Sequence, residues 1–137
     1  MFTVSAATVL ITGAARGMGL LYARRAVSEG AAAVVLWDVD ADLLDQVAAE
    51  LGPTAHAYRV DVASLADIRR ASKRVLTEVG APTLLINNAA IVRGKLFVEH
   101  DQESDIQATM AINALAPIQA YDAYYKRASD VRELIRE

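Results

Sequence analysis

Short apolar runs alternate with amphipathic stretches along most of this chain. The apolar runs span residues 7–12, 33–37, 55–61 and 83–87. Short, nearly continuous runs of this kind are typical of strands that are buried on both faces of a sheet. The stretches between them repeat their apolar residues at helical spacing and span residues 17–29, 40–51 and 64–79. Strands that alternate with helices predict a parallel sheet with right-handed crossovers and helices on both faces.

This alternation predicts an α/β protein with a Rossmann-type, doubly wound parallel sheet that stops after the fourth or fifth β–α unit. Asp40 and Ser64 are suited to cap the second and third helices. The expected spatial order of the strands is third, second, first, fourth, so the run 83–87 lies at an edge. A chain of 137 residues fits one domain, and we predict a single domain over residues 1–137.

The last part of the chain departs from the alternation. Residues 101–113 predict a helix, and Pro117 is suited to the first turn of a last helix that runs to the C-terminus. Residues 118–137 are interpreted as an atypical, charged helical tail. The apolar stripe of this tail is predicted to consist of Ile118, Tyr121, Tyr125 and Leu134.

Charge and composition exclude several classes of function. The net charge of −3 disfavours binding to nucleic acid, because contact with the phosphate backbone needs clustered Lys and Arg. The chain contains no cysteine, which excludes disulfides, thiolate metal sites and a cysteine nucleophile. No stretch approaches the ~18 apolar residues of a membrane span, and the N-terminus lacks the pattern of a signal peptide. We therefore expect a cytoplasmic protein without nucleic-acid or membrane partners.

Three glycines mark the point where the first strand turns into a helix. Thr12 and Gly13 end the strand, and Gly17, Met18 and Gly19 begin the helix. Gly13 permits a tight turn, Gly17 lets the backbone approach a pyrophosphate, and Gly19 lets the helix pack closely on the strand. The loop amides and the positive helix end then face an anion. A mobile loop is the alternative interpretation, and a Walker-type phosphate loop is excluded because no Gly-Lys-Ser/Thr follows.

Asp38 follows the second strand and indicates the type of dinucleotide. A carboxylate at that place accepts hydrogen bonds from both adenosine ribose hydroxyls and repels a 2′-phosphate. Arg16, beside the glycine loop, has the opposite preference, and capping of the next helix is the alternative role for Asp38. We predict NAD as the cofactor and NADP as the less favoured one, because a unit charge facing a phosphate at short range costs on the order of 1 kcal/mol.

Three further motifs follow the glycine loop. They are Asp61-Val62 after the third strand, Asn87-Asn88-Ala89-Ala90 after the fourth, and Asn113 in a later helix. Together with the glycine loop they resemble the nucleotide-binding half of the short-chain dehydrogenase/reductase family, from about Ala7 to Pro117. The resemblance implies that Asp61 bonds the adenine amino group, that Val62 flanks the ring, and that the Asn87–Ala90 turn steadies the central sheet and lines the cofactor ribose. It also implies a catalytic role for Asn113, which kinks its helix and holds a water of the proton relay.

The chain departs from the family pattern at two places. Ala90 stands where the family usually has glycine, and alanine costs roughly 1 kcal/mol there if the backbone needs a positive φ. The family's catalytic Ser and Tyr-x-x-x-Lys lie farther from the Asn than the sequence extends beyond Asn113. No tyrosine lies four residues from Lys126, the spacing that would let the ammonium acidify a phenol. We therefore interpret Tyr121, Tyr124 and Tyr125 as core or partner contacts.

The remaining polar residues do not predict a metal site. His56 and His100 have no second ligand at the spacing of metal sites. The acidic side chains at the start of the helix predicted for residues 101–113 are interpreted as a solvated helix entry. These side chains belong to Glu99, Asp101, Glu103 and Asp105.

Three functions follow from these patterns. The leading one is an NAD(P)-dependent oxidoreductase of the short-chain dehydrogenase/reductase type, homo-oligomeric, which transfers hydride between an alcohol or carbonyl substrate and nicotinamide. The second is a catalytically idle dinucleotide-binding or assembly module that lacks the proton donor, whose exposed fourth strand would pair with another chain. The third is an S-adenosylmethionine-dependent methyltransferase, whose ligand has no pyrophosphate and leaves Asn87-Asn88-Ala89 unexplained.

Overall fold

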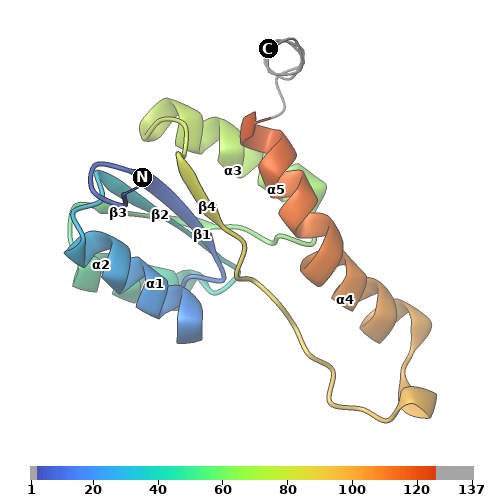
Figure 1. The fold of residues 1–137 in the computed structure, drawn as a ribbon. Coiled ribbons are helices and arrows are strands. Elements are labelled where there is room, and N and C mark those ends of the chain that lie inside the picture. Colours follow the sequence, from blue (N-terminus) through green and yellow to red (C-terminus); the bar gives the residue numbers. More distant parts are fainter. Residues whose placement is uncertain (1–2, 126–137) are drawn as a thin grey trace.

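A computed structural model describes residues 3–125 of the chain. Four parallel strands form one sheet in the order β3-β2-β1-β4. The strands are β1 (Thr8–Thr12), β2 (Ala33–Asp38), β3 (Ala55–Arg59) and β4 (Leu84–Ile86). Both the predicted fold class and the predicted strand order are confirmed (Figure 1). Residues 126–137 of the predicted tail, including Lys126 and Leu134, lie outside the described residues.

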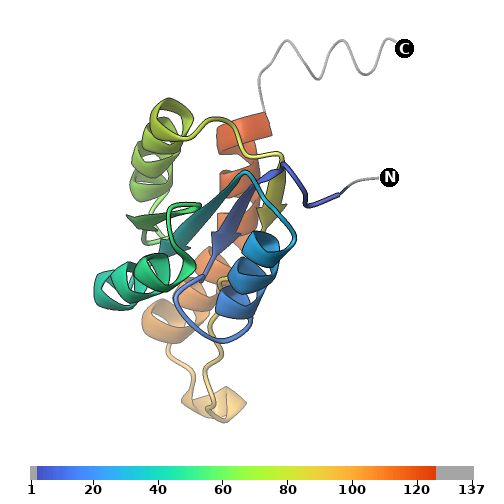
Figure 2. The ribbon, with the colours of Figure 1, turned by 90° about the vertical axis from the view of Figure 1, so that its left-hand side faces the viewer.

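Helices cover both faces of the sheet (Figures 1 and 2). On one face, α1 (Gly17–Ser28) and α2 (Ala41–Leu51) pack on strand side chains such as Val9 and Leu36. On the other face, α3 (Leu65–Glu78) and α5 (Ala116–Tyr125) pack on strand side chains such as Leu10 and Trp37. Successive side chains of a strand point to opposite faces, so wholly apolar strands supply both cores.

The predicted caps of two helices are confirmed. The Asp40 side chain accepts a hydrogen bond from the Leu43 N–H at 3.1 Å and begins α2. The Ser64 hydroxyl accepts one from the Asp67 N–H at 3.3 Å and begins α3. Each cap satisfies one of the amides that a helix leaves without an internal partner at its N-terminus.

The predicted break before Pro117 is wrong, because residues 102–125 form one continuous helical stretch. Its segments are η2 (Gln102–Gln107), α4 (Ala108–Met110), η3 (Ala111–Leu115) and α5. Ala116, at the junction, has helical backbone angles of φ −56° and ψ −43°. Pro117 has no N–H to donate and its ring crowds the preceding turn. The wide π-type turns of η3 accommodate the proline without ending the helix.

The predicted apolar stripe of the tail is wrong for Ile118 and Tyr121, while Tyr125 is half-buried. Ile118 and Tyr121 are 60% and 53% exposed, whereas Ala116 and Ala120 are buried against the sheet and α3. Small side chains let α5 approach closely, and the ring of Tyr124 packs 6.1 Å from that of Trp37. Tertiary packing therefore fixes which face of α5 points inward, with Ala116, Ala120 and Tyr124 on that face and Ile118 and Tyr121 outside.

A loop projects from the body between β4 and η2 (Figure 1), and two of its basic side chains pair with a buried carboxylate of η2. Asp105 is only 3% exposed, and its carboxylate lies 2.5 Å from the Lys95 ammonium and 3.6 Å from the Arg93 guanidinium. The interpretation of the acidic run as a solvated helix entry is therefore wrong for Asp105. The Asp101 side chain does cap η2, accepting from the N–H groups of Glu103 and Ser104.

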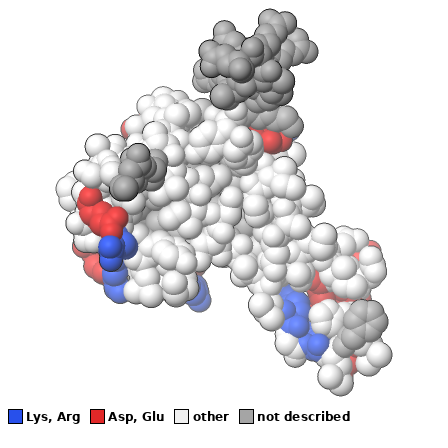
Figure 3. Space-filling view, in the orientation of Figure 1, with Lys and Arg blue, Asp and Glu red and all other residues white. Residues whose placement is uncertain are grey.

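Charged side chains gather at two places on the face seen in Figure 3, over the α1–α2 side and over the projecting loop. Most of the surface between them carries no charge in that view. Within residues 3–125, no helix combines the length and the apolar character that crossing a membrane would require.

Candidate functional site

A pocket of about 430 Å³ lies beside the carboxyl ends of the strands. In open α/β sheets, ligands bind in the crevice at these ends. The site residues predicted from the sequence that line it are Gly13, Arg16, Asp38, Asp61, Val62, Ala89 and Ala90. The predicted residues outside its lining are Thr12, Gly17, Met18, Gly19, Asn87 and Asn113. The fold thus brings residues from four separate segments to one crevice.

The glycines of the loop have different steric roles. Gly13 and Gly17 have φ of +66° and +56°, the left-handed region that favours glycine. A Cβ at Gly19 would lie 2.0 Å from the Gly13 carbonyl oxygen, whereas a Cβ at Gly17 would meet nothing within 4 Å. Gly19 therefore allows α1 to pack on the turn, and Gly17 leaves open space at the start of the helix.

Two amides of the glycine loop are already used inside the protein. The Ala14 N–H donates to the Trp37 carbonyl at 3.1 Å, and the Ala15 N–H donates to Asp38 Oδ2 at 3.0 Å. The expectation that all amides from residue 13 to 19 face a ligand is therefore too broad. These two bonds instead tie the loop to the end of β2.

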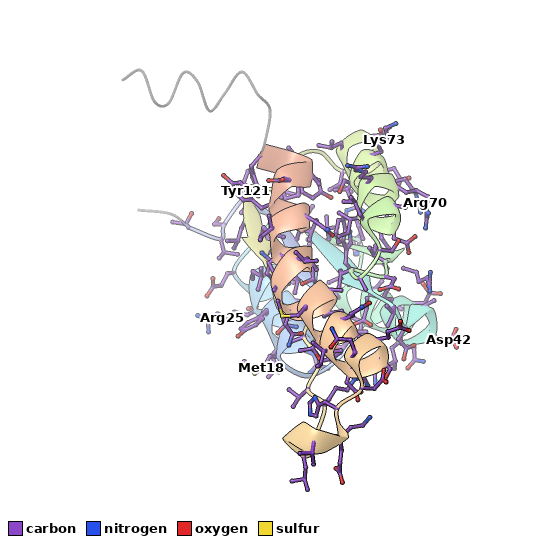
Figure 4. All side chains as sticks on the ribbon, turned by 90° about the vertical axis from the view of Figure 1, so that its right-hand side faces the viewer. Met18, Arg25, Asp42, Arg70, Lys73 and Tyr121 are labelled. Atoms are coloured by element: carbon purple, nitrogen blue, oxygen red, sulfur yellow. The ribbon has the colours of Figure 1, made fainter. Side chains whose placement is uncertain are left out.

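The first turn of α1 is the part of the loop that remains suited to an anion. Arg16 occupies the N-cap position without a side-chain capping bond, and no acidic residue lies in the first turn. The amides of Gly17, Met18 and Gly19 begin the helix and have no acceptor within it. Uncapped amides at the positive end of a helix form an anion-binding site. The Met18 side chain is exposed here (Figure 4).

Asn88 joins the ends of β1 and β4, which agrees with the expectation that the Asn87–Ala90 turn steadies the sheet, although the sequence prediction did not single out Asn88. Its Nδ2 donates to the carbonyls of Thr12 and Gly13, both at 3.1 Å. The Thr12 hydroxyl in turn accepts from the N–H groups of Asn88 and Ala89, both at 3.0 Å. The neighbouring Asn87 is exposed. Two consecutive asparagines after a buried strand were the available signal, but the sequence does not tell which one turns inward.

Asp38 and Arg16 lie at the same end of the pocket with different partners. The Asp38 carboxylate accepts the N–H groups of Ala15 at 3.0 Å and Asp40 at 3.2 Å. Asp40 caps α2, so the alternative role of Asp38 as the capping residue is excluded. The Arg16 guanidinium donates to Asp40 Oδ2 at 2.5 Å. Two backbone amides thus hold the Asp38 carboxylate in place, and Arg16 is paired with a different acid.

Asp61 and Val62 lie on another wall of the pocket. Asp61 Oδ1 accepts the Ala63 N–H at 2.9 Å, and the Asp61 N–H donates to Asp67 Oδ2 at 3.2 Å. This N–H and the neighbouring Arg70 lower the pKa of Asp67, so its carboxylate stays ionised. Val62 is 7% exposed and gives this wall an apolar surface.

Ala90 and Asn113 bound the segment that follows β4. Ala6 is the one non-glycine residue with a positive φ in the described chain, so Ala90 has no such strain. Asn113 Oδ1 accepts the Ile91 N–H, and its Nδ2 donates to the Ile91 carbonyl, both at 2.9 Å. Asn113 therefore holds Ile91 against the pocket, while its suggested role toward a water stays a prediction.

The tail tyrosines within residues 3–125 are poorly suited to donate a proton near neutral pH. Burial raises the pKa of Tyr124 to about 12 and also raises the pKa of Tyr125. The Tyr125 hydroxyl donates to the Pro82 carbonyl at 3.0 Å, and Tyr121 is exposed. A catalytic phenol needs a lowered pKa. Over the same residues, no cluster of three or more His, Cys, Asp or Glu side chains could hold a metal ion.

Comparison with known proteins gives consistent matches. A family model described as short chain dehydrogenase matches residues 7–130. "Short-chain dehydrogenase/reductase 3" of Bos taurus is 31% identical over 132 residues, which cover 94% of this chain and 43% of that protein.

Solved structures match at the level of the fold and the sequence. A blue fluorescent protein from a metagenomic library, in complex with NADPH, has a TM-score of 0.81 at 29% identity, covering 90% of this chain and 51% of its own. A metagenomic short-chain oxidoreductase in complex with NADP has a TM-score of 0.80 at 30% identity, covering 88% and 55%. The chain thus spans about half the length of these proteins.

Proposed function

This chain belongs to the short-chain dehydrogenase/reductase family, and we propose that it binds NAD in the pocket at the strand ends, as the nucleotide-binding half of an oxidoreductase that transfers hydride between an alcohol and a carbonyl compound. The observation that carries the proposal is the uncapped first turn of α1 beside that pocket. A helix start without a capping side chain or an acid leaves amides and a partial positive charge for a diphosphate.

The residues around the pocket fit a dinucleotide. The amides of Gly17, Met18 and Gly19 would hold the diphosphate. The Asp38 carboxylate would accept hydrogen bonds from the adenosine ribose hydroxyls. When bound, the nicotinamide supplies the hydride acceptor or donor.

The other contacts proposed for the dinucleotide come from the resemblance to the family. Asp61 and Val62 would contact the adenine, while Asn87, Ala89 and Ala90 would line the ribose. Asn88 and Asn113 orient the backbone that forms this wall, through their bonds to the loop and to Ile91.

The preference for NAD rests on Asp38. Its carboxylate is held by two backbone amides, so it would face a 2′-phosphate as a fixed negative charge. Such a charge at short range costs on the order of 1 kcal/mol in partly wet surroundings. The similar structures named above contain NADPH or NADP, so the preference needs a direct measurement on this chain.

The family match does not favour the two alternative functions. A methyltransferase would use the glycine loop without a diphosphate, whereas the short-chain dehydrogenase family model matches residues 7–130 of this chain. The idle binding module differs from the oxidoreductase only in turnover. No tyrosine–lysine pair of the required spacing occurs in the sequence. We expect the 137-residue chain to bind the dinucleotide without oxidising secondary alcohols, and turnover by this chain would overturn that expectation.

We also propose self-association through the side of the molecule where β4 forms the sheet edge. Leu115 and Ile118 are 50% and 60% exposed on the adjoining helix. Tyr121 projects from α5 on the side away from Arg70 and Lys73 of α3 (Figure 4). Exposed apolar side chains beside an open strand edge favour pairing with another chain. A monodisperse monomer in light scattering would contradict this.

Equilibrium titration of the 137-residue chain with NADH, NADPH and S-adenosylmethionine tests the proposed function. Trp37, the one tryptophan in the sequence, is fully buried in the sheet and reports binding through energy transfer to the reduced nicotinamide. Calorimetry measures the three affinities independently of the reporter. The proposal predicts that NADH binds most tightly and S-adenosylmethionine not at all. Tighter binding of NADPH would refute the NAD preference, and no binding of either dinucleotide would refute the function.

A further inference from the structure

Two oppositely charged side chains line the same end of the pocket. Asp38 disfavours a 2′-phosphate, and Arg16 has the charge that would attract one. The Arg16 side chain is 66% exposed, so packing within the protein does not keep it from reaching a ligand. Its guanidinium is nevertheless paired with the Asp40 carboxylate. The partner of Arg16 therefore decides whether that charge is available at the pocket.

Asp40 is held in position for this pairing by its own backbone and cap. Its Oδ1 accepts the Leu43 N–H as the cap of α2, while its Oδ2 accepts from Arg16. Its N–H donates to Asp38 Oδ1, which links it to the end of β2. An exposed ion pair is usually weak because two side chains lose their freedom when it forms. Here the cap has already fixed the acidic partner, so only Arg16 is ordered by pairing.

We propose that Asp40 determines cofactor specificity by pairing with Arg16 and so competing with the 2′-phosphate of NADPH for its guanidinium. Asp40 is a positioning residue, since it acts through Arg16 and does not line the pocket. The inference rests on the proposed function, because it needs a dinucleotide in that pocket. A 2′-phosphate must then meet the fixed charge of Asp38 and also compete with Asp40 for the guanidinium.

The variant Asp40→Asn separates the two roles of this side chain. Asparagine keeps an oxygen that can cap α2 but loses the charge that holds Arg16. Asp42→Asn is the matched control, because Asp42 lies in the first turn of the same helix and the structure gives it no bond to Arg16. The control also removes one negative charge from the start of α2, but it leaves the pairing of Arg16 with Asp40 intact. Asp40→Asn combined with Arg16→Gln tests whether any gain acts through the arginine.

The measurement is the ratio of the NADPH and NADH dissociation constants for the wild-type chain and the three variants, by calorimetry at fixed salt. We expect Asp40→Asn to bind NADPH about fivefold more tightly, the scale of an exposed ion pair. We expect NADH affinity to change by less than about twofold, because NADH has no phosphate for the released arginine. Asp42→Asn should leave the ratio near that of the wild type, and Arg16→Gln should cancel the gain.

Three results would overturn the inference while leaving the proposed function intact. They are an unchanged ratio in Asp40→Asn, an equal change in Asp42→Asn, and a gain that persists without Arg16. Asp40→Ser, which also supplies a capping oxygen, gives the same answer if Asp40→Asn does not fold. Binding of neither dinucleotide by the wild-type chain refutes the proposed function itself, and with it the inference.

Discussion

Gly17 and Gly19 belong to one sequence motif, yet replacing each by alanine should fail in a different way. A Cβ at Gly19 would lie 2.0 Å from the Gly13 carbonyl oxygen and 2.7 Å from Asn88 Nδ2. Because a backbone carbonyl cannot turn aside, α1 must move, and overpacking of this kind costs ~3 kcal/mol. A Cβ at Gly17 would meet nothing within 4 Å, so Gly17→Ala costs only the strain of its positive φ, ~1 kcal/mol.

Urea unfolding followed by Trp37 emission measures the first effect. The expected loss of unfolding free energy in Gly19→Ala corresponds to a urea midpoint that is lower by about 1.5 M. Gly52→Ala is a matched control for Gly17→Ala, since Gly52 has a φ of +79° and open space around its Cβ position. It lies at the end of α2, outside the pocket lining. Gly52 also has a ψ of −163°, a region that residues other than glycine rarely adopt, so Gly52→Ala should unfold at a urea concentration no higher than that of Gly17→Ala.

NADH titration separates Gly17→Ala from its control. The added methyl group stands where the diphosphate approaches the helix start, so we expect binding to weaken at least ~10-fold, the scale of one hydrogen bond to a charged group. Gly52→Ala should bind NADH like the wild type. Equal NADH affinities in the two variants would refute the assignment of the diphosphate to α1. A Gly19→Ala chain as stable as Gly17→Ala would refute the steric account of the loop.

Three further substitutions test other parts of the structure. Asp38→Asn should narrow the difference between NADH and NADPH affinities in calorimetry, and an unchanged ratio would remove Asp38 as the discriminating group. The Lys95 ammonium lowers the pKa of Asp105 below its ordinary value. This pair therefore stabilises the fold above pH ~4 and is lost as the pH falls through the lowered pKa. The urea midpoint of Asp105→Asn should consequently change less than that of the wild-type chain between neutral and strongly acidic pH. The same pH dependence in both chains would contradict the pairing. Tyr58→Phe removes a hydrogen bond of 2.8 Å to Glu78 and should cost about 1 kcal/mol in unfolding free energy, whereas no loss would mean that water replaces the bond equally well.

The fold could be predicted from the sequence because its signals are local. Wholly apolar runs identify strands with two covered faces, and Asp40 and Ser64 stand directly before helical periodicity. The break expected at Pro117 failed because η3 contains wide turns that accommodate proline. The prediction of the buried face of α5 failed because packing against Trp37 and the neighbouring helix fixes the orientation of α5. The spacing of residues in the sequence does not contain that information.

The candidate site could be predicted in outline but not in its internal bonds. The glycine spacing located the start of α1, and Asp38 was placed correctly beside the pocket. Nothing in the sequence indicates that the Ala15 amide bonds Asp38, or that Arg16 pairs with Asp40. Contacts of this kind depend on how two strand ends approach each other. They decide which amides and which charges remain for a ligand.

A crystal structure of the chain with NADH tests the central claim most directly. The account predicts diphosphate oxygens within hydrogen-bond distance of the amides of Gly17, Met18 and Gly19, with the adenosine ribose hydroxyls on Asp38. The amides of Ala14 and Ala15 should keep their present bonds to Trp37 and Asp38. A diphosphate bound elsewhere, or a crevice that stays empty at saturating NADH, would contradict the account.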